Sequence, residues 1–164
     1  MKTLCLLRHA KSDWDATYGA DHERPLNERG KRAAQSMGSF LKYEIEQPQI
    51  ILSSTAKRTQ ETLSLLMKHA GWNASVTYHS DLYLCSRADI ITQLSVLDDR
   101  VESALVVGHQ PTTGEFASWL LGGTQVDVPT GTFMMFSIPI LSWGELKAAE
   151  ASMSLYVTPR QLEN

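Results

Sequence analysis

Short, almost wholly apolar runs alternate along this chain with longer segments in which apolar residues recur at helical spacing. Two of these runs, 3–7 and 103–107, carry no charge and are rich in Leu and Val, which is typical of strands buried on both faces. Such strands belong to parallel sheets that have helices on either side. The alternation therefore predicts an α/β fold, a three-layer sandwich in which helices flank a mostly parallel, mixed central sheet.

Capping signals predict where the helices begin and end. Asn27 is a typical N-cap, and Ser54 or Thr55 can cap the helix that follows the second strand. Gly71 is expected to stop that helix, and residues 86–89 have the pattern of a capping box. The expected strands are 3–7, 49–53, 75–78 and 103–107, and the expected helices follow Asn27, Ser54 or Thr55, Ser86 and Pro111.

The last third of the chain has a different pattern. Residues 132–138 and 146–157 have the composition of strands, and the segment 142–144 between them has the composition of a turn. No long helical segment separates the two runs, so they are expected to add an antiparallel part to the sheet.

Composition narrows the class of protein. The length fits a single domain over residues 1–164, and the formal net charge of −3 disfavours nucleic acid as a partner. The apolar runs are too short for a membrane span or a secretory signal, so we expect a cytoplasmic protein with no membrane partner. We expect it to be a monomer or a weak homo-oligomer. Cys5 and Cys85 form no Cys-x-x-Cys pair, which argues against a disulfide framework and structural zinc.

Chemically active side chains follow three of the expected strands. Arg8 and His9 come directly after the first strand. Arg58 lies shortly after the second strand, and His109 follows the run at 103–107. In open α/β sheets, ligands bind outside the carboxyl ends of the strands. We therefore expect two histidines and two arginines around one crevice.

Two imidazoles and two guanidiniums indicate an anion with several oxygens. Arginine presents a planar fork of donors that matches phosphate or carboxylate. A neutral histidine offers a nitrogen lone pair that can attack phosphorus, and a second, protonated histidine adds charge and a hydrogen bond. Helix openings near Thr55 and Thr112 can aim backbone N–H groups at the same anion.

Several segments resemble motifs of the histidine phosphatase superfamily, and the small SixA-type phosphohistidine phosphatase branch is the best fit. They occur in the order found in that family, from Leu4 to Arg160, so the resemblance covers nearly the whole chain. Residues 6–12 resemble the Arg-His-Gly signature of the family, and residues 53–62 resemble the motif with a phosphate-binding arginine. Residues 106–111 resemble the motif with the second histidine, and residues 24–30 resemble a segment that adds another pocket arginine. Residues 142–146 and 158–160 resemble the C-terminal pattern.

The resemblance implies a phosphoglycerate mutase-like fold and a hydrolase that acts without metal or cofactor, because arginines neutralise the phosphoryl charge. His9 would attack phosphorus and form a covalent phosphohistidine intermediate, which water then hydrolyses. The implied catalytic residues are His9, His109, Arg8 and Arg58, and the implied substrate-binding residues are Arg8, Arg24, Arg58 and His109.

The sequence departs from the family pattern at two points. Ala10 stands where the wider superfamily has glycine, which matters only if the backbone there needs a positive φ. In addition, the general-acid carboxylate of other branches has no obvious counterpart, and Asp81 is the nearest candidate. A phosphohistidine substrate depends less on a general acid, because its leaving group is an imidazole with a conjugate-acid pKa of about 6.5.

Three functions remain open from the sequence. The first is a phosphohistidine phosphatase whose partner is a phosphorylated protein, and the second is a phosphomonoesterase acting on small phosphorylated molecules. The third is a non-catalytic module that binds phosphate or a phosphoprotein. Retention of both His9 and His109 disfavours the third, since binding alone needs only the arginines.

Overall fold

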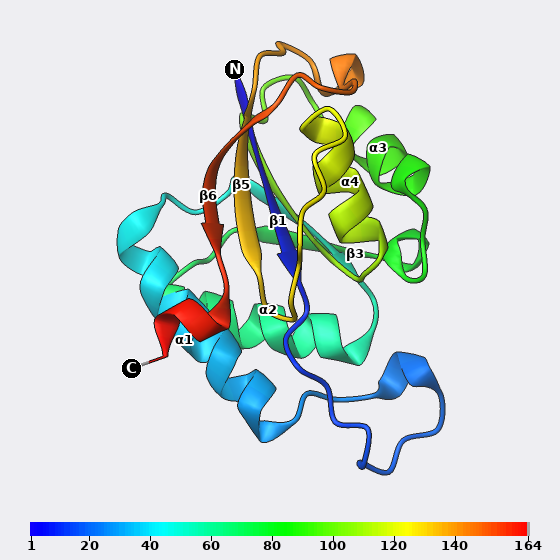
Figure 1. Cartoon of the computed structure of the whole chain (residues 1–164), viewed down its shortest axis with the longest axis vertical. Coiled ribbons are helices and arrows are strands. Elements are labelled where there is room, and N and C mark those ends of the chain that lie inside the picture. The colour runs from blue at the N-terminus through cyan, green and yellow to red at the C-terminus, as the bar shows by residue number, and fades with distance from the viewer. Residues whose placement is uncertain (164) are drawn as a thin grey trace.

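A computed structural model describes residues 1–163 of the chain; Asn164, the last residue of the predicted domain, lies outside the described residues. Strands and helices alternate up to α4, and two further strands follow (Figure 1). The strands are β1 (Lys2–Arg8), β2 (Ile50–Ser54), β3 (Ser75–His79), β4 (Ser103–Gly108), β5 (Phe133–Ile138) and β6 (Ser152–Val157). The helices are α1 (Glu28–Glu44), α2 (Lys57–Ala70), α3 (Arg87–Ser95) and α4 (Thr112–Leu120), with short 3₁₀ turns η1 (Asp21–Glu23), η2 (Ser80–Leu82), η3 (Trp143–Glu145) and η4 (Pro159–Leu162).

The six strands form one mixed sheet in the order β3-β2-β4-β1-β5-β6. The first four in this order pair in parallel, whereas β5 is antiparallel to both β1 and β6. The predicted α/β class and the mostly parallel, mixed sheet are therefore confirmed.

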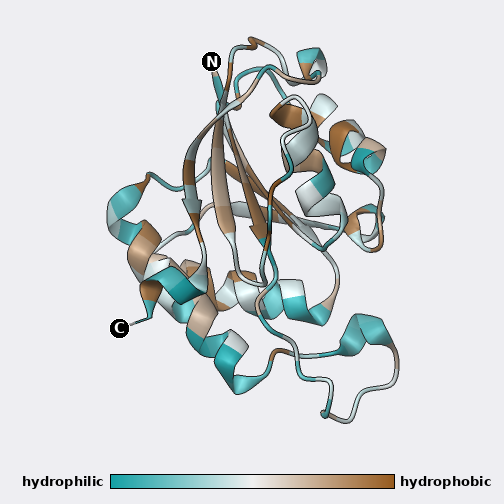
Figure 2. Ribbon diagram, viewed as in Figure 1, coloured by the Kyte–Doolittle hydropathy of each residue, from teal (hydrophilic) through white to brown (hydrophobic). Residues whose placement is uncertain are grey.

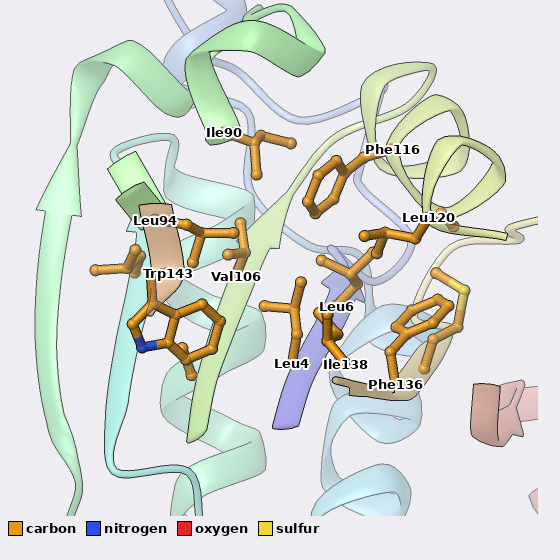
Figure 3. Close-up of a cluster of buried hydrophobic side chains, with 14 of the residues drawn as sticks. Leu4, Leu6, Ile90, Leu94, Val106, Phe116, Leu120, Phe136, Ile138 and Trp143 are labelled. Carbon is orange, nitrogen blue, oxygen red and sulfur yellow. The ribbon is translucent and has the colours of Figure 1, made fainter. Parts of the chain in front are cut away.

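Helices cover both faces of the sheet. Side chains on each strand alternate between the two faces, so the apolar strands present side chains to a helix layer on either side. On β1, Leu4 and Leu6 belong to the cluster beneath α3 and α4, whereas Cys5 and Leu7 belong to the cluster beneath α1 and α2. Figure 3 shows the first cluster, and Figure 2 shows apolar residues concentrated on the strands and polar ones on the outer turns of the helices. Within residues 1–163, no helix is long and apolar enough to cross a bilayer.

The predicted strand over 146–157 is wrong in its first half. Only Ser152–Val157 is extended in the sheet. Ala149 has a positive φ of 65°, and the N–H groups of Ala149 and Ala151 donate to carbonyl groups of α4 at 3.1 and 3.2 Å. The segment satisfies its backbone donors at the end of a helix instead of along a strand, and no alternation pattern shows this.

Most predicted helix ends are confirmed. Asn27 accepts from the N–H of Gly30, Gly71 ends α2 with a φ of 70°, and Ser86 closes a capping box with Asp89. The expected cap of α2 by Ser54 or Thr55 is wrong: the N-cap residue is Ala56, which has no side chain that can accept a hydrogen bond. The hydroxyls of Ser54 and Thr55 instead face two histidines, His109 and His22, at 2.8 Å in each case.

Close packing of α1 on α2 generates a test of the fold. A Cβ added at Gly38 would lie 2.3 Å from the carbonyl oxygen of Leu66, so Gly38→Ala must push the two helices apart. We expect a loss of about 1–3 kcal/mol in the free energy of unfolding, measured by urea denaturation, although Gly→Ala within a helix is ordinarily stabilising. Gly19→Ala is the control, because nothing lies within 4 Å of its added Cβ. Equal or higher stability of the Gly38 variant would contradict the packing described.

Candidate active site

Parallel pairing brings the two predicted histidines to the same edge of the sheet. Arg8 at the end of β1 pairs with Gly108 at the end of β4, and the N–H of His9 donates to the carbonyl of Gly108 at 3.2 Å. The centroids of the His9 and His109 rings lie 5.3 Å apart, and both residues are buried. The structure therefore brings His9 and His109 together at the carboxyl end of the sheet, where the sequence predicts them.

One nitrogen of His9 is committed to the backbone. Its Nδ1 lies 2.7 Å from the carbonyl oxygen of Ala10, and because a carbonyl oxygen only accepts, Nδ1 carries the hydrogen. The lone pair then resides on Nε2. Burial, followed by the positive charges of Arg58 and Arg8, lowers the pKa of His9 to about 4, against the effect of the Ala10 carbonyl. At neutral pH, His9 is thus an uncharged imidazole with a free nucleophilic nitrogen.

The backbone around His9 is held by contacts from other elements. The N–H of Ala10 donates to Thr62 Oγ1 at 2.9 Å, and that hydroxyl donates to the carbonyl of Arg58 at 2.7 Å. On the other side, the N–H of Gly131 donates to the carbonyl of His9 at 2.9 Å. Ala10 is fully buried and has no positive φ, so the backbone there does not require glycine. These contacts tie the candidate nucleophile to the helix that carries Arg58.

His109 presents one satisfied and one free ring nitrogen. Its Nε2 lies 2.8 Å from Ser54 Oγ, whereas its Nδ1 is buried and has no hydrogen-bond partner within residues 1–163. Burial, followed by repulsion from His9 once that ring is protonated and from Arg58, lowers the pKa of His109 to about 3. The protonated form expected from the sequence is therefore not the form of the free site. An anion next to the ring would raise this pKa again.

A carboxylate that the sequence did not point to joins two arginines near the histidine pair. Both terminal nitrogens of Arg58 donate to Asp21, one to its backbone oxygen at 2.9 Å and one to Oδ2 at 3.0 Å. Arg24 donates to Oδ1 of the same carboxylate at 2.8 Å and also to the hydroxyl of Ser12. The guanidinium of Arg24 stacks on the exposed ring of Trp14, with 3.5 Å between Cζ and the ring centroid. Asp21 thus fixes the directions of both guanidiniums.

Tyr83 completes the surroundings of Asp21. Its hydroxyl donates to Asp21 Oδ2 at 2.7 Å, and its ring meets that of His109 edge-on at 5.5 Å between centroids. Partial burial alone would raise the pKa of Asp21, but hydrogen bonds from Arg24 and Tyr83 and the charge of Arg58 hold it well below its usual range. Asp21 is therefore an ionised acceptor in the free site.

The predicted general acid, Asp81, lies in η2, two residues before Tyr83. Asp81 is exposed, and its side chain forms no hydrogen bond or ion pair within the described part of the chain. Its role as an acid stays a prediction. The signal that could have pointed to Asp21 is its position three residues before Arg24, in the same loop between β1 and α1.

Unpartnered donors indicate what the site can bind. Four buried side-chain nitrogen or oxygen atoms of residues 1–163 have no hydrogen-bond partner, and three of them belong to this cluster. Because a buried polar atom without a partner costs free energy, such atoms indicate a polar ligand. The three are Arg8 Nε, Arg58 Nε and His109 Nδ1. Arg8 also donates to the carbonyl of Val128 at 2.8 Å, which holds its guanidinium beside the segment after α4.

Comparisons with known proteins agree with this geometry. Residues 4–83 match the model of the histidine phosphatase superfamily (branch 1). The uncharacterized protein ML1117 of Mycobacterium leprae is 32% identical over 165 residues, which cover 94% of this chain and 100% of that protein. A candidate phosphohistidine phosphatase SixA from Nakamurella multipartitia is 28% identical, with a TM-score of 0.84 and 96% of each chain covered.

A further solved structure supports the fold alone. The protein histidine phosphatase SixA in complex with tungstate has a TM-score of 0.83 and 21% identity, covering 98% of this chain and 99% of its own. The buried histidine pair and its arginines thus occur in a fold shared with SixA proteins, and the sequence matches extend over nearly the whole chain. The chain belongs to the histidine phosphatase superfamily, in its SixA-type branch, and is a phosphatase.

Proposed function

We propose that this phosphatase removes the phosphoryl group from phosphohistidine without a metal, through a covalent intermediate on His9. The observation that carries the proposal is the hydrogen bond from His9 Nδ1 to the carbonyl of Ala10, which leaves Nε2 as the nucleophile. Free donors of Arg8 and Arg58 and the unpartnered nitrogen of His109 would hold the phosphoryl oxygens.

The same hydrogen bond supports both steps of the reaction. In the first step, His9 Nε2 bonds to phosphorus while the P–N bond of the substrate breaks. In the second step, water supplies a hydroxyl to phosphorus, releases a proton to solvent, and the bond to Nε2 breaks. Because Ala10 keeps the proton on Nδ1 throughout, His9 departs as a neutral imidazole rather than as an anion.

The arginines keep donors for the substrate while they are held by Asp21. Each terminal nitrogen of a guanidinium carries two hydrogens, and Asp21 takes one from each terminal nitrogen of Arg58. The second hydrogen on each nitrogen and the Nε–H stay available for phosphoryl oxygens. Asp21 offsets part of the charge of Arg24 and Arg58, and the carboxylate of Asp127 acts on Arg8, so the three guanidiniums keep one net positive charge for a phosphoryl dianion.

Within residues 1–163, the histidine cluster has no carboxylic acid that holds a proton at neutral pH, which favours a phosphoramidate over an alkyl phosphate as the substrate. Asp21 is ionised, and Asp81 is exposed and forms no hydrogen bond or ion pair with the cluster within residues 1–163. A phosphohistidine whose other ring nitrogen is protonated releases neutral imidazole, so the protein need not supply an acid. Two proteins of similar structure are described as a phosphohistidine phosphatase and a protein histidine phosphatase, which agrees with this substrate class.

A substrate panel tests the proposal directly. We expect the wild-type protein, without added metal, to dephosphorylate a phosphohistidine-bearing protein with a kcat/KM about tenfold or more above that for para-nitrophenyl phosphate. His9→Ala should lose both activities by about a thousandfold or more, because the nucleophile is gone. Asp81→Asn is the matched control and should keep both. Efficient hydrolysis of alkyl phosphates that disappears in Asp81→Asn would instead identify a phosphomonoesterase of small molecules.

Removing the charge of Asp21 should strengthen product inhibition. Asp21→Asn deletes the negative charge beside Arg24 and Arg58, so we expect the inhibition constant of inorganic phosphate to fall about threefold to tenfold. Tyr83→Phe removes a hydrogen bond to the same carboxylate without a charge change and should leave this constant within about twofold. Weaker inhibition in Asp21→Asn would mean that orienting the arginines outweighs the charge.

The histidine pKa values predict how stability depends on pH. Between about pH 4 and 6.5, His9 is neutral in the folded state and protonated in the unfolded state, so stability falls as the pH falls through this range. We expect a loss on the order of 2 kcal/mol from His9 between pH 7 and 5, with His109 acting in the same direction. Urea denaturation at both pH values measures the loss, and His9→Gln should reduce it. Imidazole NMR resonances of His9 and His109 that titrate near pH 6.5 would contradict the assignment.

A further inference from the structure

A basic groove lies next to the segment that carries the candidate nucleophile, since Lys11, two residues after His9, lines it. Its volume is about 580 Å³, and it is bounded by the first turns of α1, by Pro129 and Thr130, and by η4. Four cationic side chains line it, Lys11, Arg29, Arg32 and Arg160, which we call the basic groove residues. In Figure 1 the red turn η4 lies against α1, and residues of both elements line the groove.

The charge of the groove is largely uncompensated. Glu163 is the one acidic residue that lines it, and its carboxylate lies 3.8 Å from Arg29 with both side chains well exposed. Such an exposed pair contributes little energy, so Arg29 is free to exchange partners. The side chains of Lys11, Arg32 and Arg160 are exposed and form no hydrogen bond or ion pair within residues 1–163. The concentration of cations is unexpected in a chain whose formal net charge is −3.

The groove adjoins the candidate active site through short backbone contacts. Lys11 follows His9 by two residues, and the N–H of Gly131, next to Thr130, donates to the carbonyl of His9 at 2.9 Å. A Cβ added at Gly30 in α1 would lie 2.1 Å from the carbonyl oxygen of Lys11. A Cβ added at Gly131 would lie 2.7 Å from Pro159 Cγ. The walls of the groove are thus packed directly against the backbone that positions His9.

We propose that the basic groove is a second anion subsite, which binds an anionic group carried by the phosphorylated substrate beside the phosphoryl group that is removed. The inference rests on the proposed function. Three guanidiniums and one ammonium in a recess of this size fit a group with several negative oxygens, because charge-assisted hydrogen bonds favour clustered phosphates or carboxylates. Two sources supply this chemistry, acidic side chains flanking the phosphohistidine of a protein or a second phosphate on a small substrate.

Binding of inorganic tripolyphosphate tests the subsite without relying on activity. In Arg58→Ala protein, which disables the catalytic pocket, we expect tripolyphosphate to shift the ¹⁵N–¹H resonances of residues 29–32 and of Thr130. A groove variant with Arg29→Gln, Arg32→Gln and Arg160→Gln should weaken this binding about tenfold or more. A control variant with Lys68→Gln, Arg100→Gln and Lys147→Gln loses the same charge elsewhere on the surface and should stay within about twofold. Shifts confined to the catalytic pocket, or equal losses in the two triple variants, would overturn the proposal.

Kinetics then identify the source of the anion. The first ratio compares kcat/KM for a phosphohistidine peptide with acidic flanking residues to kcat/KM for one with neutral flanking residues. The second ratio compares kcat/KM for a small phosphorylated substrate that carries a second phosphate to kcat/KM for the same substrate without it. The groove variant should lower at least one ratio about tenfold, and the ratio that falls identifies the source. Neither ratio falling would overturn the role in substrate binding. If the wild-type protein binds tripolyphosphate in the groove but does not hydrolyse phosphohistidine, the anion subsite stands and the proposed function is wrong.

Discussion

The parallel pairing of β1 with β4 is the constraint on which the site depends. Six residue pairs run from Thr3↔Ser103 to Arg8↔Gly108, so both strands end at the same level. His9 and His109 leave the sheet side by side because of this register, and a shift of either strand by one residue would point that strand's side chains to the wrong faces. The helices on either face bury the strands fully, which makes that register energetically specified.

Collecting three guanidiniums and two imidazoles in one pocket carries an electrostatic cost, and the structure offsets it in two ways. Burial and the surrounding cations keep both histidines neutral, which spares the pocket two further charges. Asp21 accepts hydrogen bonds from Arg24 and Arg58 and so compensates part of the remaining charge. A substrate phosphoryl group then meets donors that are already oriented, which is the arrangement that stabilises a transition state with least reorganisation.

Much of the fold could be predicted because it follows from local patterns. The apolar strands, the cap at Asn27, the stop at Gly71 and the box at Ser86 each depend on residues close in sequence. The predictions that were wrong concern residues whose partners come from distant elements. Ser54 faces His109, and Ala149 bonds to the end of α4, so neither behaves as its neighbours in sequence indicate.

The sequence by itself predicted the mixed sheet, the carboxyl ends of β1, β2 and β4, and the gathering of His9, His109, Arg8 and Arg58 at that edge of the sheet. Periodic burial fixes the strands, and the carboxyl ends of parallel strands meet at one edge. Only the tertiary structure decided which nitrogen of His9 is free, that Asp21 joins Arg24 to Arg58, and that four cations form a groove next to the segment that carries His9. These features depend on the path of non-periodic loops and on contacts between residues far apart in the chain, which no local pattern encodes.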